Sequence, residues 1–325
     1  MNTIPTTLDA GAVPYTVVGA PKVESEVKAK GRASPLSVVL LNRGSRLYRG
    51  DAIGELERAG LGPVLSVEPR PDALDVESVS AKHPAARFLL LSKSASPGVQ
   101  INLAMRESTG PYVFVLWNDL SLAAQGLSSR FLERLAERDA LCRAPFFFAK
   151  GAEQLPSAAA PAMNEGSLKI IGFVPEKDGE KSLYPFDYTG IYSREKFVLT
   201  GGFDPNLGNP YWQKLDFGFR AWLWGEEIRC SQALKLSYAD SPESEDETPD
   251  EGYKWFWLKN LAPSFHGDNA SIGASRFWSY LRSRGGGSAA SAIGEFRSAR
   301  EWAALNRYRF RTDASSLVDL WDESE

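Results

Sequence analysis

Apolar and polar positions follow a repeating order in the first third of the chain, where short apolar runs alternate with longer segments of helical spacing. The apolar runs are rich in β-branched and aromatic residues, like strands covered on both faces; they lie at residues 37–41, 63–68, 87–92 and 112–117. The segments between them, at 51–62, 74–82 and 97–109, predict helices. This β-α-β-α-β-α-β order predicts an α/β fold with a mostly parallel sheet.

The later part of the chain is harder to interpret, because from about residue 183 onward the pattern is irregular and aromatic. It predicts helices at 128–141 and 212–225 and strands at 143–149 and 168–174. Three further segments have a biased composition. Residues 150–166 are rich in Ala, Pro and Ser and are expected to form a mobile loop. Residues 240–251 are acidic and are expected to form a solvated loop. Residues 293–310 predict a C-terminal helix with basic and apolar stripes.

Composition narrows the class of protein. The 325 residues are 43% hydrophobic and 24% charged, as in soluble globular proteins, and the net charge of −4 provides no overall basic field for nucleic acid. Cys142 and Cys230 lie far apart in apolar contexts, which favours a reducing compartment over a disulfide framework. No apolar stretch approaches the ~20 residues of a membrane span, and the N-terminus does not resemble a signal peptide. We therefore expect a cytoplasmic protein.

Polar side chains follow the apolar runs where parallel strands end. Asn42, Glu68 and the pair Asn118–Asp119 occupy such positions, and the carboxyl edge of an α/β sheet is where ligands bind. A solvated turn residue is an equally good interpretation of Glu68. His266, combined with an aspartate from elsewhere in the chain, would suit a hard divalent cation; spacing alone favours a polar loop histidine.

Residues 200–227 carry the most information about a second site. The glycine pair Gly201–Gly202 indicates an unusual backbone or a close approach. Asp216 and Arg220 are four residues apart on a predicted helix and can form an ion pair, worth a few tenths of a kcal/mol if that is its only role. The sequence contains no GxxxxGK[ST], GxSxG, HExxH or CxxC motif, which argues against P-loop, serine-hydrolase and zinc chemistry.

Taken in order, these pieces resemble the family 2 glycosyltransferases, which have the GT-A fold, from about Ser37 to Gly273. The resemblance rests on five quoted stretches: SVVLLNRGS, VLSVE, PGVQINLAMRESTGPYVFVLWND, YTGIYSREKFVLTGGFD and LDFGFRAWLWG. It implies a Rossmann-like, mostly parallel sheet with flanking helices. The chain then divides into an N-terminal extension (1–33), a GT-A domain with donor and acceptor halves (34–125 and 126–275) and a C-terminal helical extension (276–325).

The resemblance implies an enzyme that moves a sugar from a nucleotide-diphospho-sugar donor to an acceptor with inversion, a hexosyltransferase of EC 2.4. Residues at the family's donor positions are Glu68 for the base, Asn102, Trp117, Asn118 for the ribose, and Asp119. Asp119 and His266 would bind a divalent cation, Mn²⁺ or Mg²⁺, that bridges the donor diphosphate. The acceptor is open among a carbohydrate, a lipid-linked molecule and a protein, and the location is the cytoplasm or the periphery of a membrane.

On the acceptor side, the resemblance assigns Gly190, Gly201, Gly202, Asp204 and Trp212. The chain departs from the family at two places. Trp117 replaces the first acidic residue of the metal-binding triplet, and Gln213–Lys214 replaces the Glu-Asp pair that includes the general base. A glutamine cannot accept the acceptor's proton, which leaves Asp216 as the candidate base. The alternatives are a catalytically lapsed binding or scaffold protein with the same fold and, ranked last, an unrelated nucleotide-binding α/β protein.

Overall fold

The computed structural model describes residues 13–19, 36–43, 47–68, 76–122, 127–135, 139–150, 153–164, 167–240, 242, 244–283 and 288–321. Of the expected N-terminal extension, only 13–19 are therefore described. They form β1 (Tyr15–Gly19), an edge strand antiparallel to β4 (Arg87–Leu91).

A nine-stranded sheet dominates the described part of the chain, in the order β1-β4-β3-β2-β5-β10-β7-β11-β6. Four consecutive strands are parallel: β4, β3 (Val64–Glu68), β2 (Leu36–Leu41) and β5 (Tyr112–Trp117). The remainder is mixed and consists of β10 (Gly190–Ser193), β7 (Cys142–Phe148), β11 (Ile228–Tyr238) and β6 (Leu120–Leu122). Every residue of β2 and β3 is buried, as expected for strands covered on both faces.

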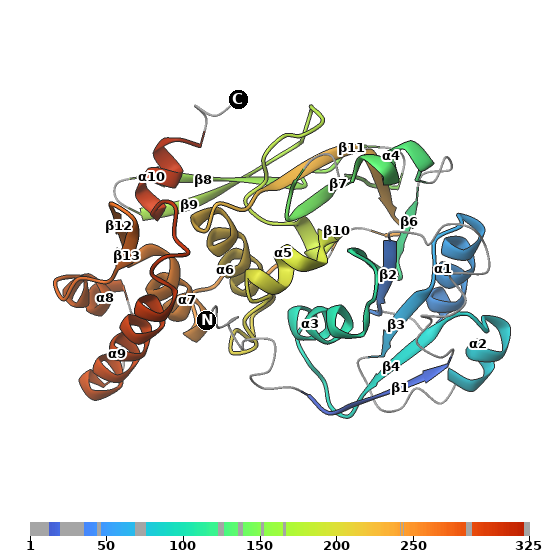
Figure 1. The fold of residues 1–325 in the computed structure, drawn as a ribbon, viewed down its shortest axis with the longest axis horizontal. Helices are drawn as coiled ribbons and strands as arrows, with labels where there is room; N and C mark the ends of the chain where they lie inside the picture. The colour runs from blue at the N-terminus through green and yellow to red at the C-terminus, as the bar shows by residue number, and fades with distance from the viewer. Residues whose placement is uncertain are drawn as a thin grey trace.

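Helices cover both faces of the parallel half. Figure 1 shows α1 (Leu47–Arg58) and α2 (Val76–Lys82) on one side of β2, β3 and β4, and α3 (Pro97–Glu107) on the other. The acceptor half carries α4 (Ser129–Arg134), α5 (Arg194–Leu199), α6 (Pro210–Leu223) and α7 (Glu251–Phe256), which runs into a π-helical turn, Trp257–Leu261. The expected α/β fold is confirmed, and its crossover helices lie where the apolar periodicity predicts them.

Two predictions for the acceptor half differ from the structure. The helix expected at 128–141 is shorter, because α4 ends at Arg134 and residues 139–141 are not helical. The stretch expected to be a mobile loop at 150–166 contains β8 (Ala158–Asn164), which pairs with β9 (Ser167–Phe173) in an antiparallel hairpin. The main chain of β8 also docks elsewhere, because the Leu183 amide donates to the Ala159 carbonyl oxygen at 2.7 Å. Ala158 and Ala159 are buried. A strand of small side chains lacks the bulky β-branched residues by which strands are usually recognised.

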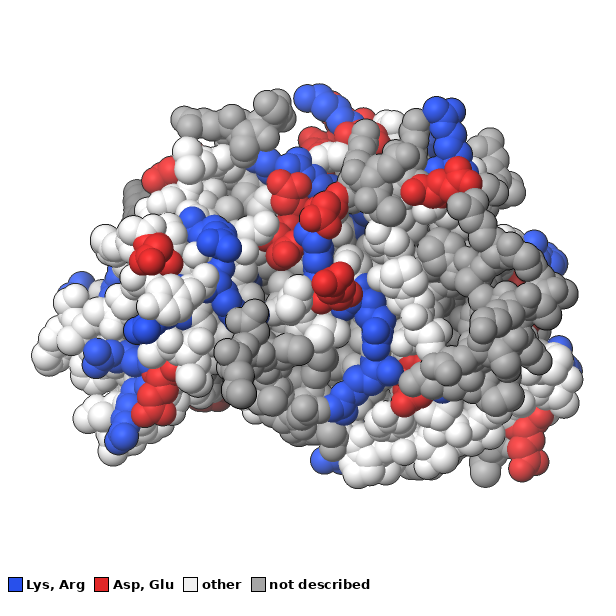
Figure 2. All heavy atoms as spheres, viewed as in Figure 1, with Lys and Arg blue, Asp and Glu red and all other residues white. Residues whose placement is uncertain are grey.

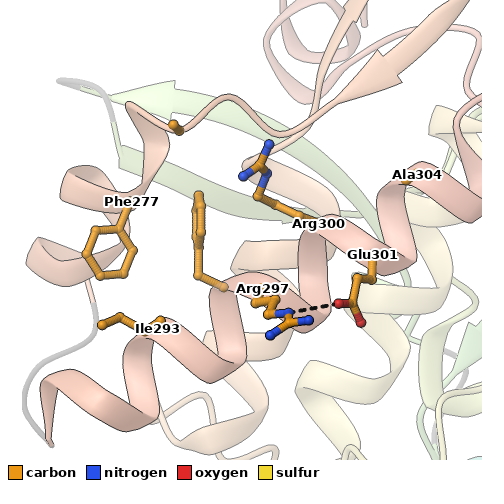
Figure 3. Close-up of a pocket in the computed structure, with 8 residues that line it drawn as sticks. Phe277, Ile293, Arg297, Arg300, Glu301 and Ala304 are labelled. Atoms are coloured by element: carbon orange, nitrogen blue, oxygen red, sulfur yellow. Dashed lines mark hydrogen bonds and ion pairs between the residues drawn. The ribbon is translucent and has the colours of Figure 1, made fainter.

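The C-terminal extension consists of the hairpin β12 (Ser264–His266) and β13 (Asn269–Ser271), then α8 (Arg276–Ser283), α9 (Ala289–Asn306) and α10 (Ala314–Asp319). α8 and α9 have an apolar cluster of their own with Leu258 and Ala262. A groove of about 560 Å³ lies between α8 and α9 (Figure 3). The proposed domain boundaries at 33, 125 and 275 stay predictions.

Two findings concern surfaces. Figure 2 shows lysine and arginine side chains next to aspartate and glutamate side chains along the middle of the visible face. Among the helices that the structure describes, none has both the length and the hydrophobicity of a membrane span.

Candidate functional site

The ends of β2, β3 and β5 bring the predicted polar side chains to one edge of the sheet. Leu41 is in register with both Val67 and Trp117, so the residues that follow lie side by side. The Asn42 amide donates to Ser66 Oγ at 2.9 Å and to the Val67 carbonyl oxygen at 2.8 Å. Asn118 Oδ1 accepts from the Arg43 main-chain N–H at 3.1 Å. The polar side chains expected at this edge of the sheet are therefore held in fixed positions.

Glu68 does not face solvent as a turn residue would. Its carboxylate is buried, lies 2.5 Å from Arg49 on α1 and accepts from Ser66 Oγ at 2.9 Å. Removing either partner of a buried ion pair would leave an uncompensated buried charge, so separating Glu68 from Arg49 is energetically costly. The structure thus places Glu68 at the predicted edge, with Arg49 as its partner.

Arg43 is the central cation of the site. Its guanidinium donates to Asp119 Oδ2 at 2.9 Å and forms two bonds to the Asp187 carboxylate, at 3.0 and 2.7 Å. It also lies 4.4 Å from the centre of the Trp117 ring, a cation–π distance. Burial disfavours the charge on Arg43, but Asp187 and Asp119 outweigh burial and raise its pKa. Arg43 therefore stays cationic between two carboxylates.

Asp187 belongs to a strained turn that faces Asp119 across Arg43. In the turn Phe186–Tyr188, Asp187 and Tyr188 have φ of 49° and 59°, in the left-handed region that non-glycine residues rarely occupy. Three side chains hold this backbone: Trp117 Nε1 donates to the Asp187 carbonyl oxygen at 2.9 Å, the Tyr192 hydroxyl to that of Tyr188 at 2.6 Å, and the Thr189 hydroxyl to that of Asp187 at 3.1 Å. Strain maintained in this way is common at functional sites.

Trp117 therefore has an identifiable role. It replaces a carboxylate of the family's triplet, and its indole packs against Arg43 while its N–H fixes the turn that carries Asp187. The Tyr238 hydroxyl from β11 adds a hydrogen bond of 2.8 Å to Asp187 Oδ2. An aspartate from a distant segment thus stands beside Asp119, although the sequence at that position gives no signal of it.

Gln213 occupies the family's base position and is fully buried. Its Nε2 donates to Ser96 Oγ at 3.0 Å and to the Asp204 carbonyl oxygen at 2.8 Å, while its Oε1 accepts from the Gly98 amide and the Tyr188 hydroxyl, both at 3.0 Å. A Cβ at Gly98 would lie 2.4 Å from that oxygen, so only glycine allows this approach. Gln213 joins α3, α6 and the strained turn, and it is a structural amide.

Lys214, the next residue, is fully buried against the rings of Tyr184, Phe186 and Tyr188, at 5.3–5.9 Å from their centres. Burial lowers the pKa of Lys214 to about 8, while Asp187 acts in the opposite direction. Lys214 also forms an ion pair with Glu245. A protonated lysine here needs the carboxylates around it.

The acidic stretch around Glu245 is anchored to α6, although residues 244–250 are mainly exposed. The Trp212 indole N–H donates to the Thr248 carbonyl oxygen and the Asn209 amide to that of Asp246, both at 3.0 Å. The stretch expected to be a solvated loop is therefore tied across the start of α6, beside Lys214.

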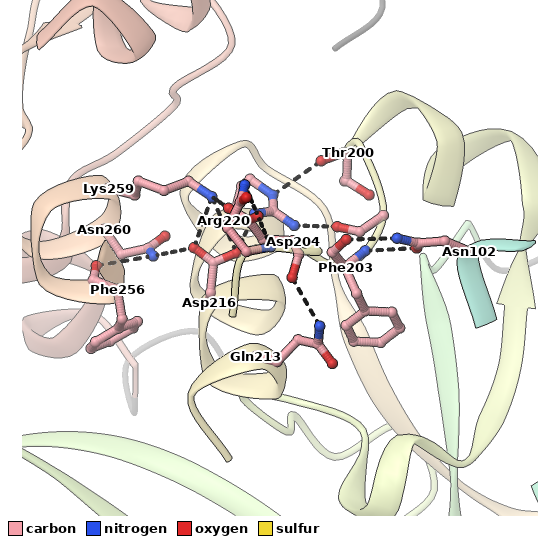
Figure 4. A network of polar contacts seen from close by, with 12 residues as sticks. Asn102, Thr200, Phe203, Asp204, Gln213, Asp216, Arg220, Phe256, Lys259 and Asn260 are labelled. Carbon is pink, nitrogen blue, oxygen red and sulfur yellow. Dashed lines mark hydrogen bonds and ion pairs between the residues drawn. The ribbon is translucent and has the colours of Figure 1, made fainter. Parts of the chain in front are cut away.

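Asp216, the predicted base, lies in a buried network of charges (Figure 4). Its carboxylate is fully buried, forms an ion pair with Arg220, lies 3.3 Å from Lys259 Nζ, and accepts from Asn260 Nδ2 at 2.9 Å. Lys259 also donates to Asp204 at 2.7 Å. The two carboxylates and two cations balance one another in a place where solvent does not reach.

The acceptor-side residues and Asn102 meet at one turn. Gly201 and Gly202, with φ of 84° and 66°, end α5. Phe203, the residue after Gly202, is bound through its main chain by Asn102 on α3. Asn102 Nδ2 donates to the Phe203 carbonyl oxygen at 2.7 Å, and Asn102 Oδ1 accepts from the Phe203 amide at 3.0 Å. Arg220 Nε donates to the Thr200 carbonyl oxygen at 3.0 Å. These residues fix the turn that presents Asp204.

The other two acceptor-side residues lie elsewhere. Gly190 is in β10, where a Cβ would lie 2.6 Å from Cys142 Sγ of the neighbouring strand. Trp212 is on α6, packs against Tyr253 and Phe256, and lines a cavity of about 890 Å³. Trp212 thus lines a cavity whose volume is within the range of small-molecule binding sites.

Asp204 should make stability depend on acid pH. Burial alone would raise the pKa of Asp204, but Lys259 and the Asn206 amide lower it to about 2. Because the folded pKa lies below the unfolded value, the stabilisation is complete above about pH 4 and is lost as pH falls toward about 2, for a total of about 2 kcal/mol. We expect Asp204→Asn to flatten the stability curve in this window, measured by urea unfolding. Asp51→Asn, at an exposed position, is the matched control and should leave the curve unchanged.

His266 and Asp119 are not brought together. His266 lies in hairpin β12–β13 opposite Asn269. Figure 1 shows this hairpin on the opposite side of the molecule from β6, the strand that follows Asp119. Within the described residues, no group of three or more His, Cys, Asp or Glu side chains is placed to hold a metal ion. However, Asp119 Oδ1 is buried and has no hydrogen-bond partner in the described structure.

Comparisons with solved structures agree with this architecture. The chain aligns with GalNAc-T7, crystallised with UDP, GalNAc and Mn²⁺, at a TM-score of 0.52 and 12% identity, covering 83% of this chain and 57% of that one. Two structures of S. aureus TarS align at 0.49 and 0.48, with 14% and 13% identity; they cover 69% and 89% of this chain and 38% and 92% of theirs. No protein-family model and no curated protein matches the sequence. The fold is that of the GT-A glycosyltransferases, and the chain spans just over half the length of GalNAc-T7.

Proposed function

We propose that the protein is an inverting, nucleotide-diphospho-sugar-dependent glycosyltransferase, a divergent relative of family 2. The observation that carries this proposal is the cluster of Arg43, Asp119 and Asp187. It lies where the carboxyl edge of the parallel strands faces the start of α6, the place where α/β sheets bind nucleotides. Asn118 and Glu68 flank it on the donor side. The cytoplasmic location stays a prediction.

Only one of the two predicted metal ligands, Asp119, is suited to a divalent cation at this edge of the sheet. Asp119 fits one ligand position, because its buried Oδ1 has no partner among the described residues. His266 does not fit, because its hairpin, β12–β13, lies on the opposite side of the molecule from β6, the strand that follows Asp119. Asp119 would therefore hold the cation, with donor phosphates as further oxygen ligands. When bound, such a cation neutralises charge on the leaving diphosphate.

Asp187 is our candidate for the general base, in place of Asp216. The Asp187 carboxylate lies beside Arg43 and Asp119 and belongs to a strained turn, whereas Asp216 is fully buried in its network of charges. In the proposed step, Asp187 accepts the proton of the acceptor hydroxyl, the hydroxyl oxygen bonds to the anomeric carbon, and the bond from that carbon to the diphosphate oxygen breaks. We propose that Asp216 and Asn102 position the Asp204 turn, and that Trp212 contacts the acceptor.

A second candidate function has a specific observation in its favour. The base position holds Gln213, whose amide groups are all used in structural hydrogen bonds. A protein that binds a nucleotide sugar without transferring the sugar would have this feature as well. The two candidates share the donor site and differ only in turnover, so a turnover measurement distinguishes them.

Asp187→Asn tests the assignment of the base. We expect hydrolysis of UDP-glucose, UDP-GlcNAc and UDP-GalNAc without acceptor to fall by about 100-fold or more, as is typical when a general base is lost, whereas calorimetric affinity for UDP stays within a few-fold. Glu77→Gln, which changes an exposed carboxylate on α2, is the matched control. Unchanged hydrolysis in Asp187→Asn would exclude Asp187 as the base. A wild type that binds UDP but hydrolyses no donor favours the second candidate.

A further inference from the structure

Positive charge is concentrated in α8, α9 and the turn that follows α9, whereas the rest of the C-terminal extension, residues 312–325, is acidic. Residues 274–311 contain eight arginines and two glutamates, although the whole chain has a net charge of −4. Figure 2 shows more blue than red over the end of the molecule formed by α8 and α9. A local excess of guanidinium groups attracts anionic surfaces even when the protein as a whole is acidic.

One face of α9 anchors this extension to the domain. Ala292, Phe296, Ala299 and Ala303 are buried in the cluster shared with α8 and Leu258. Their spacing of three and four residues defines one side of a helix. The helix is therefore held rigidly by its inner face, and its outer face is presented in a fixed orientation.

The outer face carries large apolar side chains that are exposed. Ile293 is 58% exposed, Leu305 84% and Tyr308 59%, and Trp278 on α8 is 66% exposed. Arg297 and Arg300 lie among them on α9, and the Arg297 side chain is 81% exposed. We call these six residues, Trp278, Ile293, Arg297, Arg300, Leu305 and Tyr308, the outer face. Monomeric proteins seldom expose a row of large apolar residues without a binding role.

The groove between α8 and α9 opens within the outer face. Figure 3 shows Phe277 and Ile293 pointing into the gap from the two helices, with Arg297, Arg300 and Glu301 further along α9. Apolar walls bordered by guanidinium groups are suited to an amphiphile with an anionic head and an apolar chain. α9 contributes aliphatic and basic side chains, and the neighbouring α8 contributes the aromatic Trp278. Together they provide the residue types found on helices that lie in a membrane interface.

We propose that the outer face docks the protein on an anionic phospholipid membrane. The arginines would contact lipid phosphates, each increasing the attraction several-fold near the surface, while Trp278, Ile293 and Leu305 enter the boundary between headgroups and acyl chains. The proposal concerns a surface outside the donor site and does not depend on the proposed sugar transfer. It places the protein at the periphery of a membrane.

The test is sedimentation of the full chain with vesicles of phosphatidylcholine alone or mixed with an equal part of phosphatidylglycerol, at about 0.1 M salt, where screening leaves short-range attraction intact. We expect binding to the mixed vesicles that is at least tenfold stronger than to the neutral ones. The double variant Arg297→Glu/Arg300→Glu should reduce it tenfold or more, and Trp278→Ser/Leu305→Ser should also weaken it. Because these side chains are exposed, circular dichroism should show all variants folded.

The matched control is Arg58→Glu/Lys82→Glu, which makes the same change in net charge at exposed positions of α1 and α2. It should bind the mixed vesicles like the wild type. Equal loss in the control and in the outer-face variants would show attraction by net charge only and would overturn the proposal. So would the absence of wild-type binding to mixed vesicles, or equal binding to both kinds.

Discussion

Replacing Asp119 with alanine is expected to weaken the Mn²⁺-dependent binding of UDP or GDP by roughly 100-fold or more, because even the loss of a residue that only supports a metal ligand costs 10–100-fold. Asp119 holds the one carboxylate oxygen at the sheet edge that is buried without a partner in the described structure. In this variant Arg43 keeps its ion pair with Asp187, so the guanidinium group stays in place. Isothermal titration calorimetry with and without Mn²⁺ measures the change.

The matched control for Asp119 is Glu77→Ala, which removes an exposed carboxylate from α2 and should leave the affinity unchanged. His266→Ala is equally informative, because the structure places His266 far from Asp119. We expect that variant to bind like the wild type. Retained Mn²⁺ dependence in Asp119→Ala, or its loss in His266→Ala, contradicts the assignment of the metal to Asp119 alone.

Replacing Asp216 with alanine is expected to lower the free energy of unfolding by about 3–5 kcal/mol, the usual cost of removing one partner from a buried ion pair. Arg220 and Lys259 would be left as buried cations with one carboxylate, Asp204, between them. The sequence alone suggested a helix pair worth a few tenths of a kcal/mol. The burial of the network is what raises the expected effect, and urea unfolding monitored by tryptophan fluorescence measures it.

The chain has a well-matched control for this prediction. Arg297 and Glu301 on α9 form a pair with the same four-residue spacing, but their side chains are 81% and 64% exposed. Glu301→Ala should therefore change stability by less than about 1 kcal/mol. Similar effects of Asp216→Ala and Glu301→Ala would show that the network contributes little, and would make Asp216 available again for a catalytic role.

The sequence predicts the donor half of the fold well, for a physical reason. Strands β2, β3 and β5 are buried on both faces, so they appear as continuous apolar runs that stand out from the helices between them. β8 has the opposite character, because its buried residues are Ala158, Ala159 and Pro161 and its position depends on hydrogen bonds to β9 and Leu183. Such tertiary support has no local signal.

The site is predictable to the same partial extent. Parallel strands bring Asn42, Glu68 and Asp119 to one edge, whatever residues lie elsewhere. The partners of these residues are less accessible to sequence reasoning, because Arg49 and Arg43 are ordinary loop or helix residues until the fold is known. Asp187 was missed for a different reason. What distinguishes it is a positive φ, which distant side chains maintain, and in a sequence only a glycine would have indicated such a backbone conformation.

Calorimetric titration of the purified wild-type protein with UDP and GDP, with and without Mn²⁺, tests the central claim most directly. The account predicts that at least one nucleotide binds, that Mn²⁺ strengthens the binding, and that Asp119→Ala removes this effect. If neither nucleotide binds with or without the metal, the cluster of Arg43, Asp119 and Asp187 is not a donor site. The GT-A fold of this chain would then serve a function other than sugar transfer from nucleotide donors.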